Sequence, residues 1–226
     1  MKRIGKKIAI IVIIVVGLFF YKDIFAKELN ESKSLENIKK YENIVFFGDS
    51  ITEYYPISEI YGDLPIIKSG VAGYKTTDVM DKLDKMVTRY NPTSVYILLG
   101  TNDIRHNTDE SKEQVIKNLK EIIENLKRDR KKTKIYVESL LPINHNTASG
   151  DYYVEQRKNS SIQEVNREIE QYCEEKNYVY INMYDELTDE DGNFSKKYTN
   201  DGIHPNDLGY AVMTRKLLPY IYGINE

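Results

Sequence analysis

Residues 44–50 read Ile44-Val45-Phe46-Phe47-Gly48-Asp49-Ser50, an apolar run that stops at a glycine, an acid and a hydroxyl. Four consecutive apolar residues followed by a glycine predict a short strand that is buried on both faces. Strands covered on both faces belong to parallel sheets with helices packed against them, so this stretch favours an α/β fold. The serine then follows the tip of the strand, where a helical turn begins.

A second stretch, Asp201-Gly202-Ile203-His204-Pro205, places a carboxylate and an imidazole three residues apart near the far end of the chain. A serine hydroxyl becomes a nucleophile when a histidine removes its proton and a carboxylate holds that histidine in the right tautomer. Ser50, His204 and Asp201 are therefore candidates for these three catalytic roles. Together the two stretches predict nucleophilic acyl chemistry.

Strand-like and helix-like segments alternate along the rest of the chain. Further short apolar runs lie at residues 65–67, 94–99, 134–140 and 178–182. Apolar residues repeat at helical spacing in segments 79–90, 115–126, 159–176 and 206–222. Ser111 and Gln114 form a plausible capping box for the second of these helices. The alternation predicts a parallel sheet with helices on both faces.

Polar residues follow several of the predicted strands. Gly70 and Gly73 follow the second run, Gly100-Thr101-Asn102-Asp103 follows the third, and the polar stretch 143–158 follows the fourth. In open parallel sheets, ligands bind beyond the carboxyl ends of the strands. These groups should therefore meet Ser50 at one edge, with residues 143–158 as a substrate-facing loop or lid.

Acyl transfer passes through a tetrahedral oxyanion, which requires hydrogen-bond donors aimed at it. Three candidates lie at this edge: the backbone N–H groups of Ser50 and Gly73, and the side-chain amide of Asn102. Each of these motifs, taken alone, is equally consistent with an ordinary turn or helix cap. Their occurrence in order at the ends of successive strands favours a functional site.

The four segments resemble the sequence blocks of the SGNH (GDSL) hydrolase superfamily. The matching residues are Ser50, Gly73, Asn102, and His204 with Asp201, in the order of that family and within residues 44–210. Ile51 replaces the leucine of the family name, and Tyr74-Lys75 replaces a frequent Asp-Thr pair. The resemblance implies a flavodoxin-like three-layer α/β/α sandwich with a five-stranded parallel sheet, and a metal-free serine esterase that needs no cofactor.

Composition restricts the class of partner. The whole chain of 226 residues carries a net charge of −3, and residues 1–26 hold five basic residues and one acid, which leaves −7 on residues 27–226. An acidic domain is a poor candidate for nucleic-acid binding, so we expect no nucleic-acid partner. The single cysteine, Cys173, excludes an intramolecular disulfide and falls on the apolar face of a predicted helix, where a small buried residue is expected.

The N-terminal segment has the pattern of an export signal. Basic residues precede an uncharged apolar run at residues 8–21. That run spans only ~21 Å as a helix, against a hydrocarbon core of ~30 Å, but extension to residue 26 would suffice. We therefore expect residues 1–26 to be a hydrophobic helix that acts as a signal anchor or signal peptide, residues 27–42 a tether, and 43–226 the hydrolase domain. The catalytic domain would lie outside the cytoplasm, anchored to the membrane by a single span or secreted.

Substrate expectations follow from this location. A surface esterase lies beside cell-wall polysaccharide, and Tyr54, Tyr55, Tyr61 and Tyr74 lie near the predicted site, where their rings could face sugars. We expect short-acyl esters of carbohydrate, with acetyl first. A lysophospholipase or thioesterase and a carbohydrate O-acetyltransferase remain open, because both would use the same triad.

A metal-dependent phosphoesterase and a non-catalytic binding module are weaker alternatives. Asp49, Asn102, Asp201 and His204 are plausible metal ligands, but such sites usually hold several histidines. The chain has three histidines in all. A binding module would be expected to have lost Ser50 or His204, and both are present.

Overall fold

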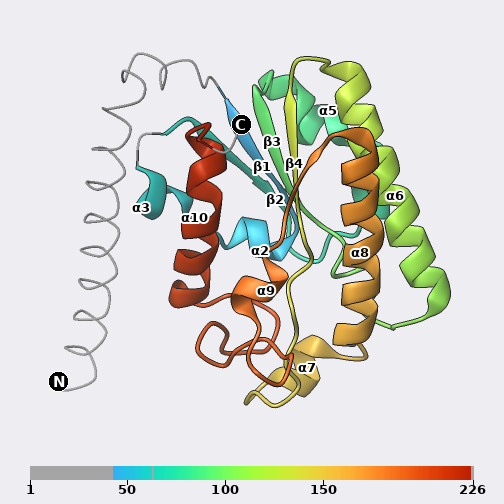
Figure 1. The fold of residues 1–226 in the computed structure, drawn as a ribbon, viewed down its shortest axis with the longest axis vertical. Coiled ribbons are helices and arrows are strands. Elements are labelled where there is room, and N and C mark those ends of the chain that lie inside the picture. Colours follow the sequence, from blue (N-terminus) through green and yellow to red (C-terminus); the bar gives the residue numbers. More distant parts are fainter. Residues whose placement is uncertain (1–42, 63, 225–226) are drawn as a thin grey trace.

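A single parallel sheet organises the computed structural model, which describes residues 43–62 and 64–224. The strands are β1 (Ile44–Gly48), β2 (Ile66–Gly70), β3 (Ser94–Leu98), β4 (Lys134–Glu138) and β5 (Val179–Ile181). Their order across the sheet is β2-β1-β3-β4-β5, with every neighbouring pair parallel (Figure 1). This is the flavodoxin-like strand order, so the predicted fold class and all five predicted strands are confirmed.

Helices cover both faces of this sheet and make three layers (Figure 1). They are α2 (Ser50–Glu53), α3 (Ile57–Tyr61), α4 (Thr76–Val79), α5 (Leu83–Met86), α6 (Asp109–Asp129), α7 (Gly150–Val154), α8 (Asn159–Lys176), α9 (Tyr184–Leu187) and α10 (Asp207–Ile221), with a 3₁₀ turn η2 (Thr88–Tyr90). Because successive strand residues face opposite sides, Val45 and Phe47 pack against α6 and α8, whereas Ile44 and Phe46 pack against α3 and α10. Every residue of β1 is buried, as the apolar run predicts.

Two helix predictions need correction. Segment 79–90 is not one helix but the short pieces α4, α5 and η2. Its apolar residues have helical spacing because each short turn directs them into the same core. The spacing therefore indicates which residues are buried, but not that one continuous helix joins them. The prediction of a capping box formed by Ser111 and Gln114 is also wrong. Helix α6 begins at Asp109, and the Thr108 hydroxyl caps it by accepting the Ser111 N–H at 3.2 Å.

Among the described residues, no helix is long and apolar enough to cross a membrane. The hydrophobic helix predicted within residues 1–26 and the tether predicted at 27–42 lie outside the described residues. Cys173 is fully buried as expected, and burial raises the pKa of its thiol to about 12.

Glu138, at the end of β4, carries a pH dependence of stability. Its carboxyl is buried on the α10 side of the sheet, and its Oε2 atom has no hydrogen-bond partner within the part of the chain that the structure describes. Burial raises the pKa of Glu138 from 4.5 to about 8. The folded state therefore keeps a proton that the unfolded chain releases, and the free energy of unfolding falls as pH rises from about 4.5 towards 8.

We expect Glu138→Gln, which mimics the protonated acid, to flatten this decline and to be more stable than the wild type at pH 8. Urea unfolding at pH 5, 6.5 and 8 measures the effect. Glu121→Gln is the matched control, because Glu121 is exposed on α6. Identical pH profiles for the wild type and Glu138→Gln would contradict this account.

Candidate active site

Ser50 is held at the start of a helical turn that directly follows the central strand β1. Gly48 allows this tight passage, since a Cβ there would lie 2.2 Å from both the Leu98 carbonyl oxygen and Thr52 Oγ1. Asp49 caps α2, and its Oδ1 accepts the Ile51 N–H at 3.0 Å. Burial raises the pKa of Asp49 to about 7, so this capping carboxyl is only partly ionised at neutral pH.

The hydroxyl of Ser50 meets the segment between α9 and α10. Ser50 Oγ lies 3.0 Å from His204 Nε2, and His204 Nδ1 lies 2.7 Å from Asp201 Oδ2. With Nδ1–H donating to the carboxylate, Nε2 is free to accept the serine proton. The three residues identified from sequence are therefore joined in one hydrogen-bonded chain.

Asp201 is fixed by more than the histidine. Its Oδ1 atom accepts the backbone N–H groups of Ile203 at 3.0 Å and His204 at 2.8 Å. Partial burial alone would raise the pKa of Asp201, but these bonds and the His204 ring lower it to about 2. The carboxylate is thus ionised at neutral pH and can stabilise a positive charge on the imidazole.

The segments that follow β2 and β3 converge on the same edge, as predicted. Gly48 at the end of β1 pairs with Gly70 of β2 and with Leu98 of β3. Asn102 Nδ2 donates to the Tyr74 carbonyl at 3.0 Å, which joins the two segments directly. Gly73 has a φ of +78° and open space around its Cβ position. Gly73 and Asn102 therefore lie on two loops that meet at the edge of the sheet where Ser50 begins α2.

The stretch after β4 also reaches the site. Tyr153 of α7 lies with its ring centroid 5.9 Å from that of His204, and Tyr54 approaches the same ring at 5.5 Å. Residues 143–158 thus lie where a lid was predicted. The side chain of Arg157, which the sequence did not single out, is buried there and contacts Asn102.

The predicted tyrosine cluster is only partly at the site. Tyr55 and Tyr61 are buried in the core, where their hydroxyls lie 3.1 Å apart. Tyr74 is half-buried beneath the Lys82 ammonium, 4.9 Å from its ring centroid. Of the predicted tyrosines, Tyr54 remains beside His204. Tyr153 of the lid also lies beside His204, and Tyr152 packs against Tyr153.

Comparison with known proteins agrees with this geometry. Residues 46–212 match the GDSL-like lipase/acylhydrolase family. A curated relative, the N-acylneuraminate cytidylyltransferase of Escherichia coli O18:K1:H7, is 25% identical over 177 residues, which are 77% of this chain and 39% of that protein. The chain therefore spans about two-fifths of the length of that relative.

Solved structures share the fold over most of their length. A protein from Streptococcus pneumonia named after platelet activating factor is 30% identical, with a TM-score of 0.74 over 90% of this chain and 99% of that one. A GDSL-like lipase from Bacteroides thetaiotaomicron has 23% identity and a TM-score of 0.71, covering 89% and 97% of the two chains. An acetylxylan esterase from Geobacillus stearothermophilus has 18% identity and a TM-score of 0.60, covering 80% and 94%. By the family match and the sheet-edge geometry together, this chain belongs to the GDSL-like lipase/acylhydrolase family.

Proposed function

We propose that this protein is a serine esterase that removes short acyl groups, acetyl above all, from carbohydrate. The hydrogen-bonded chain from Ser50 through His204 to Asp201 is the observation that carries the proposal. Ser50 Oγ attacks the ester carbonyl carbon while His204 Nε2 takes its proton, and Asp201 stabilises the resulting imidazolium. The tetrahedral intermediate then collapses, and His204 returns the proton to the departing alcohol. Water, deprotonated by His204, releases the acid from Ser50 in the same way.

The oxyanion of each tetrahedral intermediate needs donors already in place. The backbone N–H of Ser50 lies at the N-terminus of α2, where helical N–H groups have no intrahelical acceptor. We assign this group, the Gly73 N–H and Asn102 Nδ2 as the three donors. One N–H of the Asn102 amide binds the Tyr74 carbonyl, which leaves the second for the oxyanion.

A rim of tyrosines favours a sugar ester over a long-chain lipid ester. The described residues include five exposed large hydrophobic side chains, and three of these are at or next to the site: Tyr54 (53% exposed) and Tyr153 (42%) beside His204, and Tyr152 (76%) against Tyr153. Phenol rings have a flat apolar face and a polar edge, which suits the face of a sugar ring. A long acyl chain would instead need an aliphatic groove. The acetylxylan esterase among the structural neighbours acts on an ester of this kind.

The proposal extends to location. The basic residues followed by the apolar run at 8–21 favour an uncleaved anchor or a signal peptide, with the catalytic domain outside the cytoplasm. Cell-surface carbohydrate would then be the substrate within reach.

Hydrolysis of acetylated xylooligosaccharide, ethyl acetate, p-nitrophenyl octanoate and a lysophospholipid by the full chain tests this proposal. We expect the acetyl esters to be preferred. Tyr153→Ala should raise KM for the acetylated sugar about 3–10-fold, the range that the loss of one ring contact allows, and leave ethyl acetate turnover nearly unchanged.

Tyr153→Phe is the matched control, because it keeps the ring and should behave like the wild type. Preference for the lysophospholipid or the octanoate would replace the proposal with a lipase-type activity. If Tyr153→Ala lowers activity equally on acetylated xylooligosaccharide and on ethyl acetate, the rim of tyrosines does not bind the sugar. Acetyl transfer to an added sugar faster than release of acetate would identify a transferase.

A further inference from the structure

We propose that Arg157 is a positioning residue that holds the Asn102 amide in its oxyanion-binding orientation and joins it to the lid. This inference rests on the proposed esterase function. Arg157 Nη2 donates to Asn102 Oδ1 at 3.2 Å, while Asn102 Nδ2 donates to the Tyr74 carbonyl at 3.0 Å. The amide is thus held from both ends, with its oxygen and its nitrogen each facing a complementary group.

The reverse orientation of the amide is opposed at both ends. A flipped Asn102 would turn its NH₂ group toward the guanidinium, donor against donor, and its oxygen toward the Tyr74 carbonyl, acceptor against acceptor. It would also present an acceptor where negative charge develops in the transition state. Without Arg157, the bond to Tyr74 is the one side-chain hydrogen bond of Asn102, within residues 43–62 and 64–224, that would still oppose that flip.

The cost of burying this cation argues for more than a packing role. Arg157 is only 2% exposed, and its hydrogen-bond acceptors are all neutral oxygens. Burial lowers the pKa of Arg157 to about 10, which still leaves it charged at neutral pH. A buried charge without a bonded carboxylate is expensive compared with an apolar side chain of similar volume. Here the charge faces the amide oxygen and polarises the N–H groups at the other end of Asn102.

The same guanidinium holds the lid. Its Nη1 donates to the carbonyls of Tyr153 and Val154, each at 3.1 Å, and so ties down the last residues of α7. Its Nε donates to the Thr101 carbonyl at 2.7 Å, in the loop that carries Asn102. One side chain therefore connects an oxyanion donor with the ring that borders His204.

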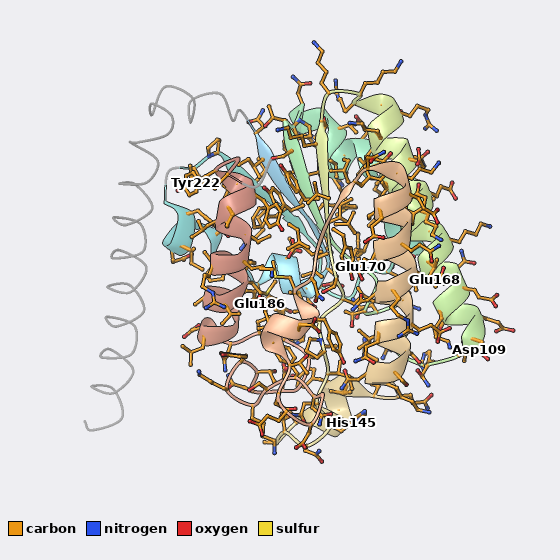
Figure 2. The ribbon with its side chains drawn as sticks, in the orientation of Figure 1. Asp109, His145, Glu168, Glu170, Glu186 and Tyr222 are labelled. Atoms are coloured by element: carbon orange, nitrogen blue, oxygen red, sulfur yellow. The ribbon has the colours of Figure 1, made fainter. Side chains whose placement is uncertain are left out.

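The backbone of Arg157 is held as well. His145, which Figure 2 shows at the end of the molecule where α7 lies, places its Nε2 3.0 Å from the Arg157 carbonyl oxygen. Backbone and guanidinium are thus both fixed, as expected for a group that orients another.

A second arginine in the same region supplies a matched control. Arg105 pairs with Glu155 through two bonds, Nε–Oε2 at 2.8 Å and Nη2–Oε1 at 2.7 Å, on the exposed outer side of the lid. This pair joins the same two segments but does not contact Asn102. If Arg157 affects kcat only by tethering the lid, replacing Arg105 should therefore lower kcat as much as replacing Arg157.

A double-mutant cycle between Arg157 and Asn102 separates orientation from tethering. Asn102→Ala should lower kcat for p-nitrophenyl acetate about 10²–10³-fold, the usual cost of one oxyanion donor. Arg157→Met should lower kcat about 10–100-fold with little change in KM, because misplacing a group near the reacting atoms costs up to about 10²-fold. In the double variant the two losses should not multiply, since Arg157 acts through Asn102.

Arg105→Met should keep kcat within about twofold of the wild type, the small effect expected of an exposed ion pair. Arg157→Lys retains the charge but not the planar set of donors, so it should recover only part of the loss. It also replaces Arg157→Met in the cycle if the latter does not fold, as judged by circular dichroism. Losses that multiply in the double variant, or an equal loss in Arg105→Met, would overturn the inference. Full activity in Ser50→Ala would instead overturn the proposed function itself.

Discussion

Ser50→Ala should abolish ester hydrolysis, with a fall in kcat of about 10⁶-fold, the loss typical of removing a catalytic serine. The variant removes the oxygen that lies 3.0 Å from His204 Nε2, so no acyl-enzyme can form. The Asp49 cap on α2 stays in place, so stability should change by less than about 1 kcal/mol. Turnover of p-nitrophenyl acetate and thermal unfolding measure the two effects.

Two further observations sharpen this test. A fluorophosphonate should add its mass to the peptide that contains Ser50 in the wild type and should not label the variant. Ser58→Ala is the control, because Ser58 is exposed on α3 and should keep full activity. EDTA should leave the wild-type rate unchanged. Activity that survives in Ser50→Ala but is lost to EDTA would replace the serine mechanism with a metal-dependent one.

Asp201→Asn should lower kcat about 10⁴-fold while leaving the fold intact. The two carboxylate oxygens of Asp201 have different partners. Oδ1 accepts the backbone N–H groups of Ile203 and His204, whereas Oδ2 faces His204 Nδ1. The asparagine oxygen must stay with the two N–H groups, so its NH₂ group must face Nδ1. That nitrogen then has to be an acceptor, which places the imidazole proton on Nε2.

A protonated Nε2 donates to Ser50 and cannot accept its proton, so the loss arises from the wrong tautomer rather than from a displaced side chain. Steady-state kinetics on p-nitrophenyl acetate and a matched thermal unfolding curve distinguish the two. Asp207→Asn, at an exposed position in the first turn of α10, should retain wild-type kinetics. An Asp201→Asn rate within tenfold of the wild type would show that Asp201 does not set the tautomer of His204.

The fold and the meeting of Ser50, Asp201 and His204 could be predicted from signals that are local in the sequence. Residues 44–47 are apolar at every position, which is what a strand covered by two helical layers requires. Ser50, Asp201 and His204 are residue types whose chemistry is specific, and the ends of parallel strands must share one edge. Topology then brought together residues that the sequence places far apart.

The features that could not be predicted from the sequence are those that depend on how a side chain is oriented in the folded protein. Tyr54 and Tyr55 are consecutive residues at the C-terminal end of α2, yet one borders His204 and the other lies in the core. A helix of four residues is too short for apolar periodicity to decide which face is buried. Arg157 carried no signal for a different reason. An arginine in a polar loop is normally exposed, and only the folded loop shows that it is enclosed by carbonyl groups and the Asn102 amide.

Ser50 and His204, the proposed nucleophile and base, lie 154 positions apart in the chain. The sheet can be complete from β1 to β5 before the segment carrying His204 takes its place, because that segment follows β5. Ordering that segment against the sheet costs further conformational entropy, so we expect it to follow the pairing of the strands. The proposed ester hydrolysis should therefore report the docking of this segment rather than the formation of the sheet. An intermediate with a native sheet would be catalytically silent, so activity recovered during refolding should lag behind the return of secondary structure.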